Sequence, residues 1–272
     1  MERAAGLIGD IHVHSTYSTD SDASMADNIE KAIEEGLSYI CFTDHIDYDY
    51  PVEDITFDFS PGDYMQSIDE MRGKYGDRIK ILAGVELGLQ AHLGPRYNEL
   101  LKTWPFDFVI GSQHLVGGLD PYYPETFHGR EDSDVYRAYF EDMLTDIRAF
   151  HAFDTLGHLD YIVRYGRSRQ KSYSYRQYAD LIDEILKLLV RYNLALESNT
   201  AGLRKQLGFP NPHPDVLRRY RELGGTLVTI GSDAHRPHAV GFALNTARDI
   251  LKSCGFTHTV YYEKRKVQFV RL

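Results

Sequence analysis

Two short motifs in this sequence place metal-binding side chains two residues apart. His12 and His14 follow one apolar segment, and Asp233 and His235 follow another near the far end of the chain. Because alternate residues of an extended strand point to the same side, each pair can converge on one ion. Imidazole and carboxylate groups without thiolates argue against a purely structural zinc site. The motifs therefore indicate a catalytic metal site.

Further imidazole and carboxylate groups recur just past other strand-like segments: His45, Glu86, His114 and His158. Each has an ordinary alternative when taken singly, because either of the last two histidines could be a core residue bonded to a backbone carbonyl, and Glu86 could be a surface carboxylate. Glu197 also follows a strand but looks less like a ligand. The recurrence of such groups at almost every expected strand end is harder to explain by chance than any one of them. We therefore expect one shared site that performs metal-assisted hydrolysis.

The elements that must position these residues are short β-branched or aromatic segments alternating with helical ones. The expected strands are Leu7–Val13, Tyr39–Thr43, Lys80–Val85, Phe106–Ile110, Thr155–Gly157, Leu194–Leu196 and Thr226–Ile230. Such alternation predicts parallel strands covered by helices. We expect an α/β fold, a distorted (β/α)7 barrel resembling the TIM barrel, with the metal site at the C-terminal ends of the strands. Residues 1–272 should form one domain.

Helix start and stop signals separate the expected strands. The helical segments are Ser24–Gly36, Ser60–Gly76, Tyr175–Tyr192 and Pro214–Gly224, which begin at a capping serine, an early proline or an apolar residue at helical spacing. The last segment, Thr257–Leu272, reads as a β-hairpin with a charged turn.

Composition excludes several classes of protein. The net charge of −10 argues against a general nucleic-acid binder, which would carry a basic patch. Cys41 and Cys254 are too few for a disulfide framework. No segment reads as a signal peptide or is long enough to span a membrane, so we expect a cytoplasmic protein with no membrane partner.

Together these residues resemble the polymerase and histidinol phosphatase (PHP) superfamily, from the first motif to the last. The pattern of that family opens with His-x-His, adds a third ligand six residues later, and continues with Asp-His, Glu, His, His and Asp-x-His. Every element is present, and the third ligand falls on Asp20, where some members have histidine. The matching positions are His12, His14, Asp20, His45, Glu86, His114, His158, Asp233 and His235.

The resemblance implies three divalent ions, for which Zn²⁺, Fe²⁺ and Mn²⁺ are all suitable. One ion would be held by His12, His14, Glu86 and Asp233. Glu86 would bridge to a second ion, held also by His114 and His158. The third ion would be held by Asp20, His45 and His235.

Arg164 and Arg204 follow the fifth and sixth expected strands, where their guanidinium groups could hold a phosphoryl group. The segments that contain them also resemble the histidinol-phosphatase branch, which hydrolyses L-histidinol phosphate in histidine biosynthesis. We hypothesise that a metal-bridging hydroxide attacks phosphorus while the two arginines hold the phosphoryl oxygens. Asp44, His128 and Asp160 are candidates for the acid that protonates the leaving group, and His128 is also a candidate for substrate binding.

Two acidic and aromatic loops, Asp47–Phe59 and Asp120–Glu125, should overhang the site and suit the ammonium and imidazole groups of histidinol, although they could equally be solvated loops. The alternatives are a phosphoesterase for nucleotides or another small phosphate ester, and an amidohydrolase, whose barrels also open with His-x-His. The use of Glu86 as a ligand departs from the amidohydrolase pattern. A non-catalytic module is a further alternative, but such modules often lose ligands, and all nine positions are present here.

Overall fold

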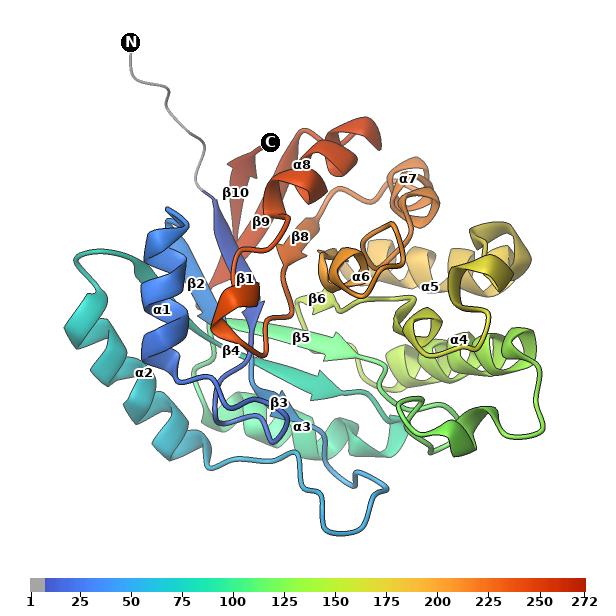
Figure 1. The fold of residues 1–272 in the computed structure, drawn as a ribbon, viewed down its shortest axis with the longest axis horizontal. Coiled ribbons are helices and arrows are strands. Elements are labelled where there is room, and N and C mark those ends of the chain that lie inside the picture. Colours follow the sequence, from blue (N-terminus) through green and yellow to red (C-terminus); the bar gives the residue numbers. More distant parts are fainter. Residues whose placement is uncertain (1–7) are drawn as a thin grey trace.

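Eight strands within residues 8–272, the part of the chain that the computed structural model describes, form one parallel sheet that curls into a nearly closed barrel (Figure 1). Seven follow the order β1-β2-β4-β5-β6-β7-β8, and β3 pairs with β4 beside this path. They are β1 (Gly9–Val13), β2 (Tyr39–Phe42), β3 (His45–Ile46), β4 (Lys80–Gly88), β5 (Phe108–Ser112), β6 (Thr155–Leu156), β7 (Ala195–Asn199) and β8 (Val228–Gly231). The predicted α/β barrel is confirmed; Leu7, where its first strand was expected to begin, lies outside the described residues.

The first and last strands of the barrel meet through a single β-bridge between Val13 and Ala234, just past the end of β8. The backbone N–H of His14 donates to the carbonyl of Ala234 (2.9 Å). The buried carboxylate of Asp10 accepts hydrogen bonds from the backbone N–H groups of Ser232 (2.9 Å) and Gly241 (2.8 Å). This closure brings the two ends of the chain's metal-binding pattern to one place.

Several predicted strands ended too early in the sequence. β4 continues past Val85 to Gly88, and β5 and β7 end two and three residues beyond the predicted limits. The sequence pattern located strands by their apolar residues, whereas the hydrogen-bonded ladder continues through polar residues whose side chains point into the barrel mouth. Glu86 therefore lies within a strand, paired with His45 of the unpredicted β3.

Helices surround the sheet (Figure 1). The α-helices are α1 (Met25–Glu34), α2 (Pro61–Tyr75), α3 (Gly94–Thr103), α4 (Asp132–Ala149), α5 (Ala179–Tyr192), α6 (Ala201–Arg204), α7 (Pro214–Glu222) and α8 (Leu244–Ser253). The 3₁₀ turns are η1 (Ala91–Leu93), η2 (Pro124–Phe127), η3 (Tyr161–Arg164), η4 (Arg169–Ser172), η5 (Tyr175–Tyr178) and η6 (Pro237–Ala239).

Helix caps follow the predicted signals. The side chains of Ser24 and Ser60 accept hydrogen bonds from the N–H groups three residues on, at the starts of α1 and α2. The helix expected from Tyr175 begins as the 3₁₀ turn η5 and becomes α-helical at Ala179. Asn193, with a left-handed backbone, ends α5.

The predicted C-terminal hairpin is present as β9 (His258–Glu263) paired antiparallel with β10 (Lys266–Arg271). Its side chains Val260, Tyr261 and Tyr262 pack with inward-facing residues near the amino ends of the barrel strands, including Ile11 and Phe108. The hairpin therefore plugs the end of the barrel opposite to the metal-binding motifs.

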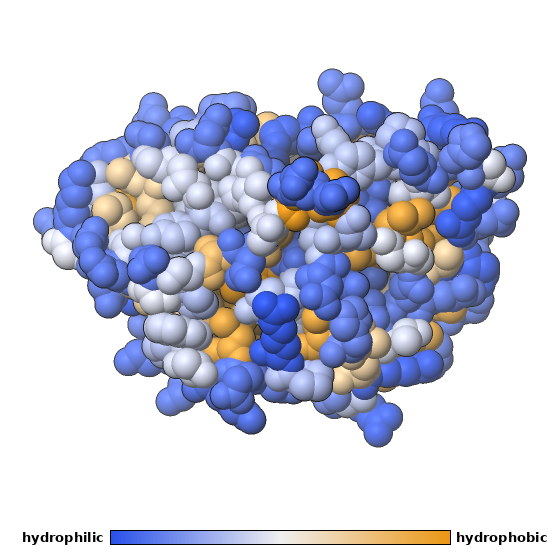
Figure 2. Space-filling view, turned by 90° about the horizontal axis from the view of Figure 1, so that it is seen from below, coloured by the Kyte–Doolittle hydropathy of each residue, from blue (hydrophilic) through white to orange (hydrophobic). Residues whose placement is uncertain are grey.

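The face seen from below in Figure 1 is mostly hydrophilic, and apolar side chains show there as separate patches (Figure 2). The small extent of these patches agrees with the burial of most apolar side chains in the large core between the sheet and the helices. Among the described helices, none combines the length and hydrophobicity needed to cross a membrane.

Candidate metal centre

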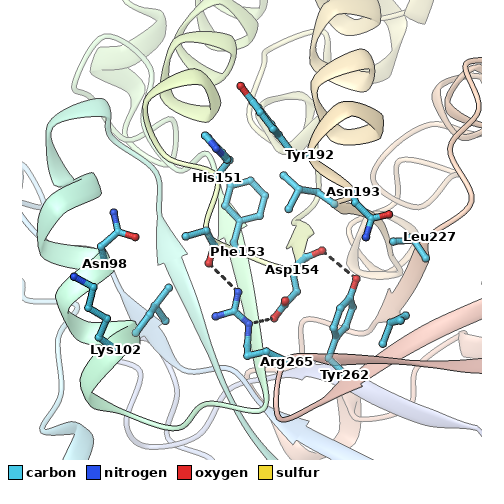
Figure 3. Close-up of a pocket in the computed structure, with 14 residues that line it drawn as sticks. Asn98, Lys102, His151, Phe153, Asp154, Tyr192, Asn193, Leu227, Tyr262 and Arg265 are labelled. Atoms are coloured by element: carbon cyan, nitrogen blue, oxygen red, sulfur yellow. Dashed lines mark hydrogen bonds and ion pairs between the residues drawn. The ribbon is translucent and has the colours of Figure 1, made fainter.

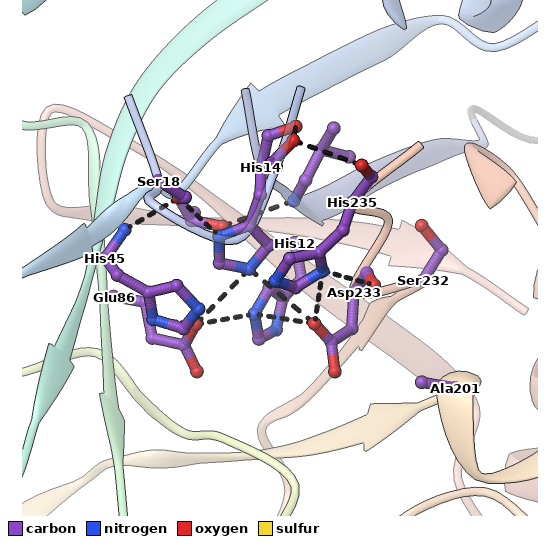
Figure 4. A network of polar contacts seen from close by, with 12 residues as sticks. His12, His14, Ser18, His45, Glu86, Ala201, Ser232, Asp233 and His235 are labelled. Carbon is purple, nitrogen blue, oxygen red and sulfur yellow. Dashed lines mark hydrogen bonds and ion pairs between the residues drawn. The ribbon is translucent and has the colours of Figure 1, made fainter. Parts of the chain in front are cut away.

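A fully buried carboxylate, that of Glu86 on β4, lies at the centre of the barrel mouth (Figure 4). Its two oxygens lie between 3.0 and 3.3 Å from imidazole nitrogens of five residues: His12, His14, His45, His114 and His158. These residues come from different strands or the segments that follow them. The barrel therefore brings imidazole groups that are dispersed over the sequence together around one carboxylate.

Asp233 and His235 lie on the β8 side of this cluster. The Asp233 Oδ1 atom is 3.6 Å from His14 Nε2 and 3.4 Å from His235 Nδ1. His235 Nε2 contacts Asp20 Oδ2 at 3.0 Å, whereas His45 Nε2 is 4.0 Å from the same oxygen. All nine predicted ligands thus lie in one cluster.

Four overlapping groups of these side chains have ligand atoms close enough to share an ion, within 4.8 Å of one another. They are His12–His14–Glu86, Glu86–His114–His158, His14–His45–His235 and His45–Asp47–His114. The first two lie within the expected sets for two ions. The third joins His45 and His235 with His14 rather than with Asp20, and the fourth adds Asp47, which was not among the predicted ligands.

Unpartnered polar atoms in the cluster fit a metal. Within residues 8–272, His14 Nε2, His45 Nδ1 and Asp47 Oδ1 are buried and have no hydrogen-bond partner. The His14 ring also stacks between those of His45 and His235, with ring centroids 4.3 and 4.0 Å away. Such atoms are costly to bury alone but are satisfied when they coordinate a cation.

Electrostatics favours the unprotonated ligand forms at two central positions. Burial, together with the neighbouring His235 and His45 imidazoles, holds the pKa of His14 well below its usual value. Burial would raise the pKa of Glu86, but the imidazoles of His12, His45 and His114 hold it well below the ordinary range. Metal ions bind neutral imidazole and ionised carboxylate, so both shifts suit the ligand role.

Two outer carboxylates orient the histidines. Glu197 Oε1 lies 2.6 Å from His12 Nδ1, and Asp47 Oδ2 lies 2.6 Å from His114 Nδ1. Each such contact fixes the imidazole tautomer and leaves Nε2 for an ion. The sequence reasoning placed Asp47 in an acidic loop that suits the substrate and not among the groups that contact the ligands, although it stands two residues beyond His45. The sequence made Glu197 a weak candidate for a ligand. In the structure its carboxylate instead contacts His12 Nδ1.

Both predicted arginines line the cleft above the cluster. The buried guanidinium of Arg164 donates to Asn211 Oδ1 (2.9 Å), Asp233 Oδ2 (2.9 Å) and Asn199 Oδ1 (3.0 Å). That of Arg204 donates to the backbone carbonyls of Ser232 (3.0 Å) and Asp233 (2.8 Å). These contacts hold two cationic groups beside the cluster. Asn199 opens the stretch around Arg204 that resembles the histidinol-phosphatase branch, although no role was predicted for it, and Asn211 had no distinctive sequence signal.

The three predicted proton donors are not among the residues that line the cleft. Asp44 is fully buried and accepts hydrogen bonds from the Ser15 N–H (2.6 Å) and the Ser18 hydroxyl (2.7 Å). Because Ser18 Oγ also contacts His14 Nδ1 at 3.0 Å, Asp44 is linked to a candidate ligand, and its catalytic role stays a prediction. Burial raises the pKa of this carboxyl.

The other two candidates lie outside the lining of the cleft as well. His128 is exposed on the segment after η2 and is not among the residues that line the cleft, so its substrate contact stays a prediction. Asp160 is buried behind the cleft, where it accepts hydrogen bonds from Asn211 Nδ2 (2.6 Å) and the backbone N–H of His213 (2.8 Å). Its contacts stabilise the segment that carries Asn211.

The cleft over the cluster has a volume of about 610 Å³. Both predicted acidic and aromatic loops border it, the first through Asp47 and Tyr50 and the second through Asp120, Tyr122 and Tyr123. The Tyr50 hydroxyl donates to the Asp120 carboxylate and so ties the loops together. The cleft thus offers acidic groups on one wall and the two arginines on another.

Comparison with known proteins agrees with this geometry. The family model described as PHP domain matches residues 10–201. The chain is 34% identical to the probable histidinol-phosphatase of Clostridium acetobutylicum, covering 97% of this chain and all of the relative. It is 31% identical to the histidinol-phosphatase of Lactococcus lactis over 95% of both chains.

Solved structures show the same relationship. A crystal structure of the histidinol phosphate phosphatase of Lactococcus lactis, in complex with zinc, L-histidinol and phosphate, superposes with a TM-score of 0.89 at 31% identity. The match covers 96% of this chain and 98% of that one. A structure from Listeria monocytogenes, at 20% identity and a TM-score of 0.76, shares the fold.

Proposed function

Because this chain belongs to the PHP domain family, we propose that it is a metal-dependent phosphomonoesterase that hydrolyses L-histidinol phosphate to L-histidinol and phosphate. The observation that carries the proposal is the presence of a buried imidazole–carboxylate cluster and two arginines in one cleft. The relatives that align over nearly the whole chain support the substrate. The reaction would belong to histidine biosynthesis in the cytoplasm.

Metal ligation is proposed for the nine clustered residues, with three divalent ions of Zn²⁺, Fe²⁺ or Mn²⁺. The zinc in the Lactococcus lactis structure supports zinc among these. Asp47 is a further candidate, because it shares a group of close ligand atoms with His45 and His114. When bound, such ions lower the pKa of a water molecule and neutralise phosphoryl oxygens.

Arg164 and Arg204 would hold the phosphoryl group. Their guanidinium groups are fixed by Asn199, Asn211 and backbone carbonyls, so little conformational entropy is lost when a phosphate binds. The Arg164 contact with Asp233 keeps this arginine beside the ligand cluster. Positive charge placed there stabilises the charge that develops on the phosphoryl oxygens.

The acidic wall of the cleft would receive the organic part of the substrate. Histidinol carries an ammonium group and an imidazole, which suit the carboxylates of Asp47 and Asp120 and the rings of Tyr50 and Tyr123. Asp47 also contacts His114, so Asp120 is the carboxylate that we assign to substrate recognition.

Phosphate release from L-histidinol phosphate, p-nitrophenyl phosphate and a nucleoside 3′,5′-bisphosphate tests the proposal with metal-loaded protein. We expect kcat/KM for histidinol phosphate to exceed the other two by several orders of magnitude. A flat profile or a preference for the nucleotide would reject the assigned substrate while keeping the metal-dependent chemistry. Loss of turnover on all three substrates would reject the phosphatase itself.

A further inference from the structure

A second cleft of about 460 Å³ lies at the end of the barrel opposite to the metal cluster (Figure 3). Its walls come from α3, from the segment that leads into β6, from the end of α5 and from the C-terminal hairpin. These are the amino ends of the barrel strands, whereas the candidate ligands stand at their carboxyl ends. The second cleft is therefore a separate site, and its volume lies within the range of about 300–1,000 Å³ usual for small-molecule pockets.

Arg265, in the turn of the hairpin, supplies a fixed positive charge to this cleft. Its Nε atom lies 2.6 Å from Asp154 Oδ2, and its Nη2 group donates to the Ala152 carbonyl at 2.8 Å. Within residues 8–272, no hydrogen bond or ion pair involves its Nη1 group. Figure 3 shows the guanidinium inside the cleft, between Lys102 and Tyr262. A donor held in place with hydrogen-bonding capacity to spare suits an anionic ligand.

Lys102 adds a second positive charge at the rim. It is 74% exposed, and its ion-pair partner Glu99 is distant, at 4.0 Å. Among the lining side chains, Arg265 and Lys102 carry positive charge and Asp154 carries negative charge, so the lining bears one net positive charge in a chain with a net charge of −10. Positive charge in a cleft of an acidic protein attracts anions to that cleft.

The remaining lining is apolar or planar. The rings of His151 and Tyr192 stack almost in parallel, with centroids 3.9 Å apart and 5° between the planes. Phe153 and Leu194 form part of the floor, and Asn193 contributes an amide. Apolar walls with a few fixed polar groups are typical of sites for small organic ligands.

We propose that this cleft binds a small organic anion with a planar ring, whose negative group contacts Arg265 and Lys102 while the ring packs beside Phe153 and the His151–Tyr192 pair. The site is independent of the proposed phosphatase activity. It also rests on the hairpin, whose Tyr262 hydroxyl donates to the Asp154 carbonyl at 3.3 Å.

Titration of the metal-loaded protein with 8-anilinonaphthalene-1-sulfonate, a planar aromatic anion that fluoresces in apolar surroundings, tests the proposal. We expect saturable binding to the unaltered protein. The charge reversal Lys102→Glu should raise the Kd by about fivefold or more, because an exposed ion pair contributes up to about 1 kcal/mol and reversal adds repulsion. Asn98→Trp, at an exposed position on α3, should fill the cleft and remove the saturable signal.

Lys252→Glu is the matched control. Lys252, like Lys102, stands in the last turn of a helix, three residues after an acidic partner, but away from the cleft. We expect it to bind the dye as the unaltered protein does. The proposal is overturned by absence of saturable binding, by unchanged binding in Lys102→Glu and Asn98→Trp, or by equal weakening in the control.

Thermal unfolding and phosphate release are measured on the same variants, since none of the altered residues lies in the metal cleft. Both should remain at the unaltered level. If Lys102→Glu and Asn98→Trp lose dye binding but unfold normally, the proposed anion site is supported even when neither the variants nor the unaltered protein release phosphate. The failure of either proposal can therefore be recognised separately.

Discussion

Replacing Glu197 by glutamine should weaken metal binding without altering the size of the side chain. Glu197 uses both carboxylate oxygens: Oε1 lies 2.6 Å from His12 Nδ1, while Oε2 accepts from the backbone N–H of His158 (2.8 Å) and from Asn199 Nδ2 (3.0 Å). If His12 binds an ion through Nε2, its Nδ1 carries the hydrogen and donates to Glu197. Three donors therefore converge on a residue that is 1% exposed.

Glutamine offers one oxygen and one NH₂ group, so at least one of these donors must face another donor. A buried donor left without an acceptor costs about 1–3 kcal/mol. Loss of an orienting partner behind a metal-bound histidine typically lowers affinity or activity by about 10- to 100-fold, which is about 1.4–2.7 kcal/mol. The first figure is a cost to folding and the second concerns the metal, so we expect a 10- to 100-fold loss of metal affinity in Glu197→Gln.

Competition with a chelator, followed by metal analysis, measures that affinity. The kcat value at saturating metal should recover in part, because the variant keeps the shape of the site. Glu184→Gln, at an exposed position on α5, is the control that changes the same chemical group outside the site. Equal metal affinity in Glu197→Gln and the unaltered protein would refute the orienting role, as would an equal loss in the control.

Four further predictions concern other parts of the molecule. Arg204→Ala should lower kcat/KM for histidinol phosphate by about 10²-fold with metal content retained, and unchanged kinetics would remove this arginine from the mechanism. Asp120→Asn should raise KM for histidinol phosphate by about tenfold but leave p-nitrophenyl phosphate unaffected, since p-nitrophenyl phosphate has no cationic group; parallel changes would contradict this. Chelation should abolish phosphate release and lower Tm by about 5 °C or more, with each of Zn²⁺, Fe²⁺ and Mn²⁺ tested for recovery; an unchanged Tm would argue against buried ligands. Burial raises the pKa of Asp146 from 3.8 to about 6, so its folded form holds a proton more tightly than the unfolded chain and stability falls as pH rises from about 4 to 6. Asp146→Asn should therefore raise the free energy of unfolding at pH 7.5 by about 1–3 kcal/mol but not at pH 4, and equal effects at both pH values in urea titrations would contradict this account.

The sequence predicted the fold and the clustering of candidate ligands because both depend on periodicity. Alternate residues on a strand share a side, so His12 and His14, like Asp233 and His235, could be assigned to one face without coordinates. Parallel strands then place their carboxyl ends together. These rules need no knowledge of individual side-chain contacts.

The surroundings of other residues depend on contacts between segments that are distant in sequence, which periodicity does not reveal. Asp44 stands beside His45 in the chain, yet its carboxylate faces Ser15 and Ser18, and no periodicity distinguishes that environment from the cleft. His128 lies on a segment whose path is set by tertiary packing. The contact of Asp47 with a ligand was not predicted because it depends on the approach of His114 from β5.

The plug formed by the hairpin has a consequence for the order in which this chain can fold during synthesis. Barrel closure joins Val13 to Ala234, and the interior near Ile11 is covered by residues 258–271. An emerging chain must therefore hold β1 with β2 on one side but without β8 and the hairpin until almost the whole sequence has left the ribosome. Contacts of such long sequence separation form slowly. We expect the metal ions to load only after translation has passed His235.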